Sequence, residues 1–292
     1  MSFTSFMVRT LFKKGDDKRD AGLTTPECVE RFDDIQYGVD PKWNVLDVYR
    51  NRDIDGKQPL IVSIHGGGWV YGDKERYQFY CMDLVKRGFS VVNFTYGLAP
   101  KFKYPSQLKD CNDVFVWIMN NAEKYGFDTD HIFAVGDSAG GHLLALYSCL
   151  LNNDEIKKEY SFQVPEGLKL KAVALNCGVY EMKKEDKGLT ANLMKDFLPN
   201  KGTVEEYRMI SPINYVNEKF PPCIVMTASD DFLKDQAMPM VNRLKEKGVD
   251  VRYMYYGDDE HKLGHVFHLN MRSDDAKKCN DDQCDYFKEF LR

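Results

Sequence analysis

A serine stands between glycines in the segment Gly136-Asp137-Ser138-Ala139-Gly140-Gly141, directly after the apolar run 131–135. Where a strand turns sharply into a helix, flanking glycines make room for the bend and leave the serine hydroxyl exposed on a strained backbone. A phosphate-binding loop or an ordinary turn is the alternative reading of so glycine-rich a segment. The strand before it and the helix after it favour a nucleophile, and we predict that role for Ser138.

A second glycine-rich turn supplies what a serine nucleophile needs. The apolar run 60–64 leads directly into His65-Gly66-Gly67-Gly68-Trp69. Consecutive glycines leave backbone N–H groups unshielded, so that they can stabilise the oxyanion formed when a serine attacks a carbonyl. We predict the N–H groups of Gly67, Gly68 and Ala139 as the oxyanion donors. His65 is expected to be a structural residue of this loop.

The general base is expected among the chain's histidines. His131 begins a predicted strand and His142 lies one helical turn after Ser138, and we expect structural roles for both. The other three, His261, His265 and His268, follow the last predicted strand, where a loop can reach back over the sheet edge. Because His265 has a glycine before it and an apolar residue after it, we predict His265 as the base.

The acid that orients this histidine is expected at the end of the preceding strand. That strand leads into Ser229-Asp230-Asp231-Phe232-Leu233-Lys234-Asp235, where three aspartates compete. At least one of them is also a candidate cap for the helix that follows. Whichever is chosen, the order along the chain is Ser, Asp, His, as in α/β-hydrolases.

The elements that position these residues alternate along the chain. Short, nearly continuous apolar runs are typical of strands buried on both faces, and therefore of a parallel sheet. An alternating pattern over about 33–50 predicts two antiparallel strands before them. The predicted parallel strands are 60–64, 90–94, 131–135, 171–175, 223–226 and 251–255, and the predicted helices are 77–87, 108–125, 139–151 and 237–247.

This alternation predicts an α/β fold: a mostly parallel, doubly wound sheet with helices on both faces and a small lid insertion. We expect one domain over 1–292, because Ser138 and its partners come from both halves of the chain. Residues 1–32 are predicted to form an N-terminal arm, with 13–26 a charged surface arm or loop. Residues 178–222 contain no clear strand and are predicted to be a lid; surface helices packed on the core are the alternative.

Charge and cysteine content exclude several classes of protein. Forty Lys and Arg residues against 45 Asp and Glu give a net charge of −5, so we expect no nucleic-acid partner. Eight scattered cysteines are too few for a disulfide scaffold. Cys279 and Cys284 lie close together, but no second Cys/His pair completes a zinc pattern, and we expect no metal and no cofactor.

The chain shows neither a long apolar segment nor a signal-peptide pattern. The charges Arg9, Lys13 and Lys14 follow the apolar patches of the N-terminus instead of preceding them. We therefore expect a cytoplasmic protein that does not enter a membrane. The sequence leaves the oligomeric state open, a homodimer included.

From about residue 35 onward the sequence resembles the hormone-sensitive-lipase-like branch of the α/β-hydrolases, which includes bacterial carboxylesterases and acetyl and feruloyl esterases. The resemblance rests on the two glycine-rich motifs and on three further segments: Tyr96-Gly97-Leu98-Ala99-Pro100 with Tyr104-Pro105, 228–235, and His265-Val266-Phe267. In that family's D-x-L-x-D pattern the first aspartate is catalytic. The resemblance therefore implies Asp231, with Asp235 as the second aspartate of the pattern.

Two departures from the family pattern affect the predicted site. Gly97 stands where the family usually has arginine, so an interaction near the serine turn is missing or supplied elsewhere. The N-terminal segment is short for a large helical cap, which implies a more open site. Trp69, Tyr96 and Phe267 are the predicted substrate-binding residues, and Tyr71 and Tyr180 are further aromatic candidates.

The expected activity is a serine carboxylesterase that hydrolyses short-chain acyl or aryl esters through Ser138, Asp231 and His265. The resemblance suggests acetyl or feruloyl esters of plant-derived carbohydrates as small-molecule substrates. Two alternatives stay open. The same triad could cleave a C–N bond, as in an arylformamidase or a peptidase, or the fold could serve a non-catalytic small-molecule receptor.

Overall fold

The structure is a computed structural model that describes residues 2–292, and an eight-stranded sheet forms its centre. The strand order is β1-β2-β4-β3-β5-β6-β7-β8; β2 is antiparallel to β1 and β4, and all other neighbours are parallel. The predicted mostly parallel sheet, with an antiparallel pair first, is confirmed. The strands are β1 Val29–Gln36, β2 Val45–Asn51, β3 Gln58–Ile64, β4 Ser90–Phe94, β5 Phe127–Asp137, β6 Leu170–Asn176, β7 Cys223–Ala228 and β8 Val251–Tyr256.

Helices cover both faces of the sheet, as the predicted doubly wound fold requires. Side chains of α2 and α9 pack with one set of strand residues, and those of α3, α4 and α8 pack with the other. Alternate residues of β3 enter the two cores, since Leu60 and Val62 lie on one side and Ile61 on the other. The helices are α1 Phe3–Asp20, α2 Lys74–Val85, α3 Ser106–Tyr125, α4 Ala139–Asn152, α5 Asp154–Lys157, α6 Leu189–Phe197, α7 Val204–Ile210, α8 Ala237–Glu246 and α9 Asp274–Lys288.

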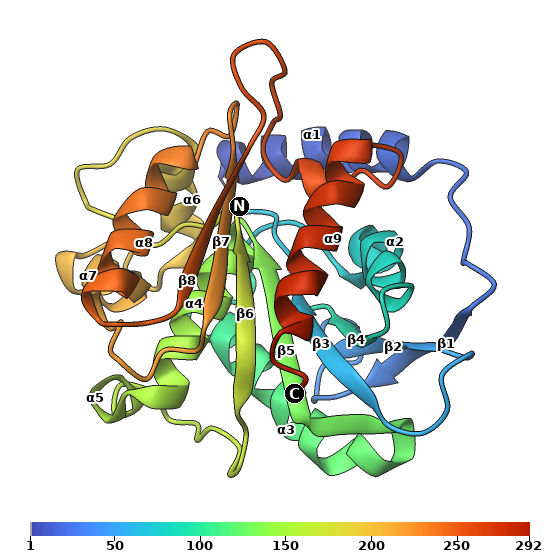
Figure 1. Ribbon diagram of the computed structural model, residues 1–292. Helices are drawn as coiled ribbons and strands as arrows, with labels where there is room; N and C mark the ends of the chain where they lie inside the picture. The colour runs from blue at the N-terminus through green and yellow to red at the C-terminus, as the bar shows by residue number, and fades with distance from the viewer. Residues whose placement is uncertain (1) are drawn as a thin grey trace.

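The N-terminal segment differs from the prediction. Residues 13–20 are not an arm or loop but the second half of α1, which lies across the top of the molecule in Figure 1. The Ser2 side chain caps this helix by accepting from the Ser5 N–H, and Lys13 pairs with Asp17 one turn on at 2.6 Å. Gly15 does not interrupt the helix. β1 also begins earlier than predicted, at Val29.

Residues 178–222, the predicted lid, contain two helices, α6 and α7, and the short 3₁₀ helix η1 Pro212–Asn214. The Asp196 carboxylate of α6 accepts hydrogen bonds from the Ser2 N–H (2.7 Å) and the Ser5 hydroxyl (2.6 Å). The start of α1 and the end of α6 are therefore tied together.

Within residues 2–292, no helix combines the length and the apolar character needed to span a bilayer.

Candidate active site

Ser138 lies at the junction of β5 and α4. Its φ of +52° is a backbone conformation that residues other than glycine rarely adopt. Its N–H donates to the Asn176 carbonyl of β6 at 2.9 Å, and its carbonyl accepts from the His142 N–H in α4. A side chain at Gly140 would collide with the Ile64 carbonyl of β3, so only glycine lets α4 approach the sheet this closely. The strained turn predicted from the sequence therefore holds Ser138 at the end of the sheet.

The turn after β3 brings both predicted oxyanion glycines, Gly67 and Gly68, beside Ser138. Gly67 has φ +103° and its carbonyl accepts from the Val70 and Tyr71 N–H groups, so the loop is tightly folded. Gly67 lines a large cavity together with Ser138, whereas Gly68 and Ala139 line a smaller one that Ser138 also lines. Ala139 opens α4, where the first backbone N–H groups have no partner within the helix.

Tyr77 of α2 joins these two turns, a role the sequence did not reveal. Its hydroxyl accepts from the Gly66 N–H at 2.8 Å and donates to the Asp137 carboxylate at 2.7 Å. Burial raises the pKa of Asp137 to about 7, although the hydrogen bond from Tyr77 opposes this shift. Position 77 lies at the start of an apolar helix face, so its sequence pattern is that of an ordinary core residue.

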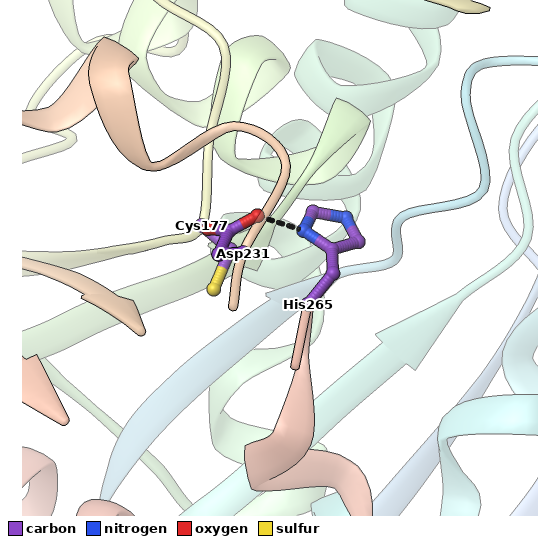
Figure 2. Close-up of side chains that lie close together, drawn as sticks. All are labelled: Cys177, Asp231 and His265. Carbon is purple, nitrogen blue, oxygen red and sulfur yellow. Dashed lines mark hydrogen bonds and ion pairs between the residues drawn. The ribbon is translucent and has the colours of Figure 1, made fainter. Parts of the chain in front are cut away.

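Asp231 and His265 contact each other, with His265 Nδ1 2.7 Å from Asp231 Oδ1 (Figure 2). The same carboxylate accepts from the Leu233 N–H at 2.9 Å and the Thr227 hydroxyl at 2.8 Å. Burial acts to raise the pKa of Asp231, but its hydrogen bonds, that of His265 foremost, hold it below the usual value. Asp231 is therefore ionised near neutral pH, and the Nδ1–H of His265 donates to it.

Backbone pairing between two loops brings this acid and this histidine together. The Asp230 N–H donates to the Leu263 carbonyl at 2.9 Å, and the Leu263 N–H donates to the Ser229 hydroxyl at 3.1 Å. Asp230 and Gly264 form an isolated parallel bridge. The loop after β8 is thus an extension of the sheet edge, and the histidine loop is aligned with the acid loop.

The neighbouring histidines lie elsewhere. His261 is exposed and pairs with Asp275 at 2.9 Å. His268 is fully buried against the ring of Tyr80, and burial lowers its pKa to about 3. Of the three histidines after β8, only His265 lines the cavities that contain Ser138.

His65 occupies the structural position predicted for it. Its ring is fully buried, stacks on Tyr96 at a centroid distance of 4.0 Å, and places Nδ1 2.7 Å from the Gly66 carbonyl. Burial lowers its pKa to about 4. The predicted substrate-binding role of Tyr96 is contradicted, because its ring is buried in this stack and its hydroxyl donates to the His65 carbonyl.

Trp69 and His142 form a second structural pair. The indole Nε1–H donates to His142 Nδ1 at 3.1 Å, and His142 Nε2 lies 2.6 Å from the Ile210 carbonyl. Burial lowers the pKa of His142 to about 4, so the ring is neutral and donates through Nε2. Trp69 lines the smaller cavity, but its indole is only 1% exposed and forms a fixed wall there.

Two cavities meet at Ser138 and His265. The larger, about 310 Å³, extends under α1; the smaller, about 20 Å³, extends under α6. The larger is lined by Leu11, Phe12, Gly15, Asp16, Arg19, Gly66, Gly67, Tyr71, Gly72, Tyr77, Asp137, Ser138, Phe232, His265, Val266 and Leu269. The smaller is lined by Phe12, Gly68, Trp69, Ser138, Ala139, Val179, Leu189, Thr190, Leu193, Phe232, Leu233 and His265.

The predicted role of Phe267 is also contradicted. Phe267 packs on Tyr256, with 5.4 Å between the ring centroids, and lines neither cavity. Phe232 lines both cavities, and its ring centroid lies 4.3 Å from that of His265. Phe232 directly follows the acid, a position that could have indicated it. Tyr71 lines the larger cavity and donates to Asp16, and Tyr180 is buried away from both.

Residues 46–241 match the family model described as BD-FAE. The chain belongs to the BD-FAE family. This membership and the fold confirm the predicted resemblance to the hormone-sensitive-lipase-like branch of the α/β-hydrolases.

Several relatives of this chain are esterases. Esterase LipC of Mycobacterium tuberculosis is 30% identical over 72% of this chain and 54% of its own length. The arylesterase of Saccharolobus solfataricus is 32% identical over 65% of this chain and 63% of its own length. This chain spans about half the length of several curated relatives that it matches.

The crystal structure of esterase B from Lactobacillus rhamnosis has the same fold. Its TM-score is 0.86 at 23% identity, over 98% of this chain and 95% of that one. The predicted α/β-hydrolase fold is therefore confirmed.

Proposed function

We propose that this protein is a serine carboxylesterase acting on esters of small acyl groups. The observation that carries the proposal is the meeting of Ser138, on its strained turn, and the Asp231–His265 pair at one cavity. An ionised carboxylate bound to Nδ1 keeps the imidazole in the tautomer whose Nε2 can accept the proton of the serine hydroxyl. The esterases among its relatives support the same reaction class.

In the proposed reaction Ser138 Oγ attacks the ester carbonyl while His265 Nε2 takes the hydroxyl proton. The N–H groups of Gly67, Gly68 and Ala139 stabilise the oxyanion, each such donor typically contributing about 3 kcal/mol to the transition state. His265 then protonates the departing alcohol. Water, activated by the same imidazole, hydrolyses the acyl-enzyme and restores Ser138.

The unequal cavities support a preference for short acyl groups. The smaller cavity, about 20 Å³, has room for little more than a methyl group beside the oxyanion glycine Gly68. The larger one, about 310 Å³, opens on the other side and has both aromatic and charged walls, Phe12, Asp16 and Arg19 among them. We assign the acyl chain to the smaller cavity and the alcohol to the larger, with α6 of segment 178–222 covering the acyl side.

The test is a substrate panel of p-nitrophenyl esters from acetate to octanoate, with methyl ferulate, acetylated xylo-oligosaccharides and p-nitroacetanilide. We expect the highest kcat/KM for acetate, a steep decrease from acetate to butyrate and beyond, and slow anilide cleavage. Ser138→Ala should abolish turnover with an unchanged circular dichroism spectrum. Activity retained in Ser138→Ala would refute the serine mechanism, and preferred cleavage of the anilide would replace the esterase by an amide hydrolase.

A further inference from the structure

A cysteine lies beside the acid and the histidine of the proposed triad. Cys177 follows β6, the strand between the one that ends at Ser138 and the one that precedes Asp231, so the sheet order places it there. Cys177 Sγ, an Asp231 carboxylate oxygen and a ring nitrogen of His265 all lie within 4.8 Å of one another. Figure 2 shows the three side chains lying together. The proposed ester hydrolysis does not use this thiol.

Cys177 is held in position firmly. It is 1% exposed, has φ +47°, and its N–H donates to the Met226 carbonyl at 2.7 Å. Its Sγ lies 3.8 Å from the Met226 thioether sulfur. Burial raises the pKa of the thiol well above its ordinary value, and the Asp231 charge adds to this, so Cys177 is not a thiolate nucleophile.

Thiolate sulfur, imidazole nitrogen and carboxylate oxygen are the three ligand types that Zn²⁺ takes in proteins. One thiolate and one carboxylate together neutralise the charge of the ion, which a buried site requires. We propose that Cys177, Asp231 and His265 form an inhibitory site for Zn²⁺, in which the metal replaces the proton between the acid and the base.

Binding of one Zn²⁺ ion at this site releases one proton. Zn²⁺ loses water ligands and gains bonds from Cys177 Sγ, an Asp231 oxygen and His265 Nδ1. The S–H bond breaks and its proton leaves to solvent, while the imidazole proton moves from Nδ1 to Nε2. A protonated Nε2 cannot accept the proton of Ser138, so the bound metal stops the reaction without covering the serine.

The test compares the wild type with Cys177→Ala and Cys177→Ser, two replacements that remove the soft sulfur ligand. Hydrolysis of p-nitrophenyl acetate is measured against increasing ZnCl₂, with MgCl₂ as the hard-cation control. We expect Zn²⁺, but not Mg²⁺, to inhibit the wild type. Without added metal both variants should hydrolyse the ester at the wild-type rate, and they should need at least about tenfold more Zn²⁺ for half inhibition.

Two matched variants test other sources of Zn²⁺ inhibition. Among residues 2–292, Cys28 is the one cysteine that is not buried. His261 and Asp275 form an exposed His–carboxylate pair. Cys28→Ala and His261→Ala should be inhibited like the wild type. Inhibition that persists unchanged in both Cys177 variants, or that disappears in Cys28→Ala or His261→Ala, would overturn the proposed site.

The inhibition assay rests on the proposed esterase activity, but metal binding does not. A binding measurement therefore tests the metal site independently of the esterase proposal. Co²⁺ replaces Zn²⁺ in such sites and gives a thiolate-to-metal charge-transfer band. The wild type and Ser138→Ala should both show this band, and Cys177→Ser should not. Without the band in Ser138→Ala the metal site is refuted; with the band but no hydrolysis of any ester, the site stands and the esterase proposal fails.

Discussion

At the scale of single residues, hydrogen bonds distinguish the two adjacent aspartates. Asp231 is 2% exposed and its carboxylate accepts from Thr227, Leu233 and His265. Asp230 is exposed, and its backbone N–H, not its carboxylate, joins the two loops by donating to the Leu263 carbonyl. The family pattern implied Asp231, and its geometry is that of the residue able to orient the imidazole.

Asp231→Asn tests this difference against Asp230→Asn. An amide at 231 cannot act as a charged acceptor for Nδ1–H, so we expect kcat to fall roughly 10⁴-fold. The same exchange at 230 leaves the backbone bond to Leu263 intact and should change kcat less than about threefold. Steady-state kinetics on p-nitrophenyl acetate check both, and the reverse ranking would move the acid to Asp230.

Tyr77→Phe tests the link between the nucleophile turn and the oxyanion loop. Without the hydroxyl, the buried Gly66 N–H loses its acceptor and the loop is free to shift, so we expect kcat to fall roughly tenfold or more with little change in KM. An unsatisfied buried donor should also lower the free energy of unfolding by about 1–3 kcal/mol.

Tyr80→Phe is the matched control for Tyr77, because it removes a buried hydroxyl from the same helix. The Tyr80 hydroxyl contacts Gln283 of α9, away from the site. This variant should be destabilised without a decrease in kcat. An equal loss of kcat in both variants would show that Tyr77 acts through stability alone.

At the scale of elements, α1 and α6 complete the walls of the two cavities. Leu11 and Phe12 of α1 line the larger cavity, and Leu189 and Leu193 of α6 line the smaller one. Asp196 ties the two helices together. In the proposed reaction the sheet and its loops therefore carry the reacting groups, and these two helices limit the size of the groups that fit beside them.

Leu193→Ala tests the assignment of the acyl chain to the cavity under α6. Leu193 is 3% exposed and lies against Gly68, so its truncation should extend this space. Burial of each methylene contributes about 0.8 kcal/mol to binding, so room for about two more methylenes should favour the longer chain. We therefore expect the ratio of kcat/KM for hexanoate to that for acetate to rise about tenfold.

Met194→Ala is the control for that variant. Met194 is a fully buried α6 residue that lines neither cavity, so both truncations destabilise the protein while only one enlarges the site. A chain-length profile that stays unchanged in Leu193→Ala would place the acyl group in the larger cavity.

At the scale of the whole molecule, the family arginine missing at position 97 has a visible consequence. A side chain at Gly97 would meet the Phe102 ring, and the Asp110 carboxylate accepts from the Gly97 N–H (2.8 Å) and the Asn44 side chain (3.0 Å). The loop before β2, the loop after β4 and helix α3 thus meet at one carboxyl. Burial raises the pKa of Asp110 to about 6, despite these neutral donors.

This raised pKa predicts a pH dependence of stability. The folded protein holds the Asp110 proton up to about pH 6, and the unfolded chain releases it near pH 3.9. Ionised Asp110 therefore destabilises the fold increasingly as the pH rises through this window, by about 3 kcal/mol at most. Asp110→Asn removes the effect.

Urea unfolding at pH 4.5 and pH 7.5 measures this contribution. We expect the free energy of unfolding of Asp110→Asn, relative to that of the wild type, to be higher at pH 7.5 than at pH 4.5. Exchange of Asp113 for Asn is the control. Asp113 lies one helical turn from Asp110, is only half-buried and pairs with Lys109, so this exchange should give a much smaller gain than Asp110→Asn. A constant difference between wild type and Asp110→Asn at both pH values would contradict the prediction.

The sequence by itself determined the sheet, the strained turn at Ser138 and the choice of His265 among the histidines for the proposed site. Continuous apolar runs and glycine-rich turns are local patterns, and the spacing of side chains along one strand or helix suffices to interpret them. The same local reasoning failed for 13–20, where a glycine and dense charge concealed a helix that is stabilised by its cap and by contacts with α6.

Only the tertiary structure decided which groups meet. The bridge between Asp230 and Gly264 aligns His265 with Asp231, the order of β5, β6 and β7 places Cys177 beside them, and Tyr77 reaches the site from α2. The sequence pattern singled out Tyr96 and Phe267 as substrate-binding residues and did not single out Phe232. Contacts between residues distant in sequence depend on packing and strand order, which no local pattern encodes. These contacts put Phe232 at the cavity, Tyr96 in the core and the half-buried Phe267 against Tyr256.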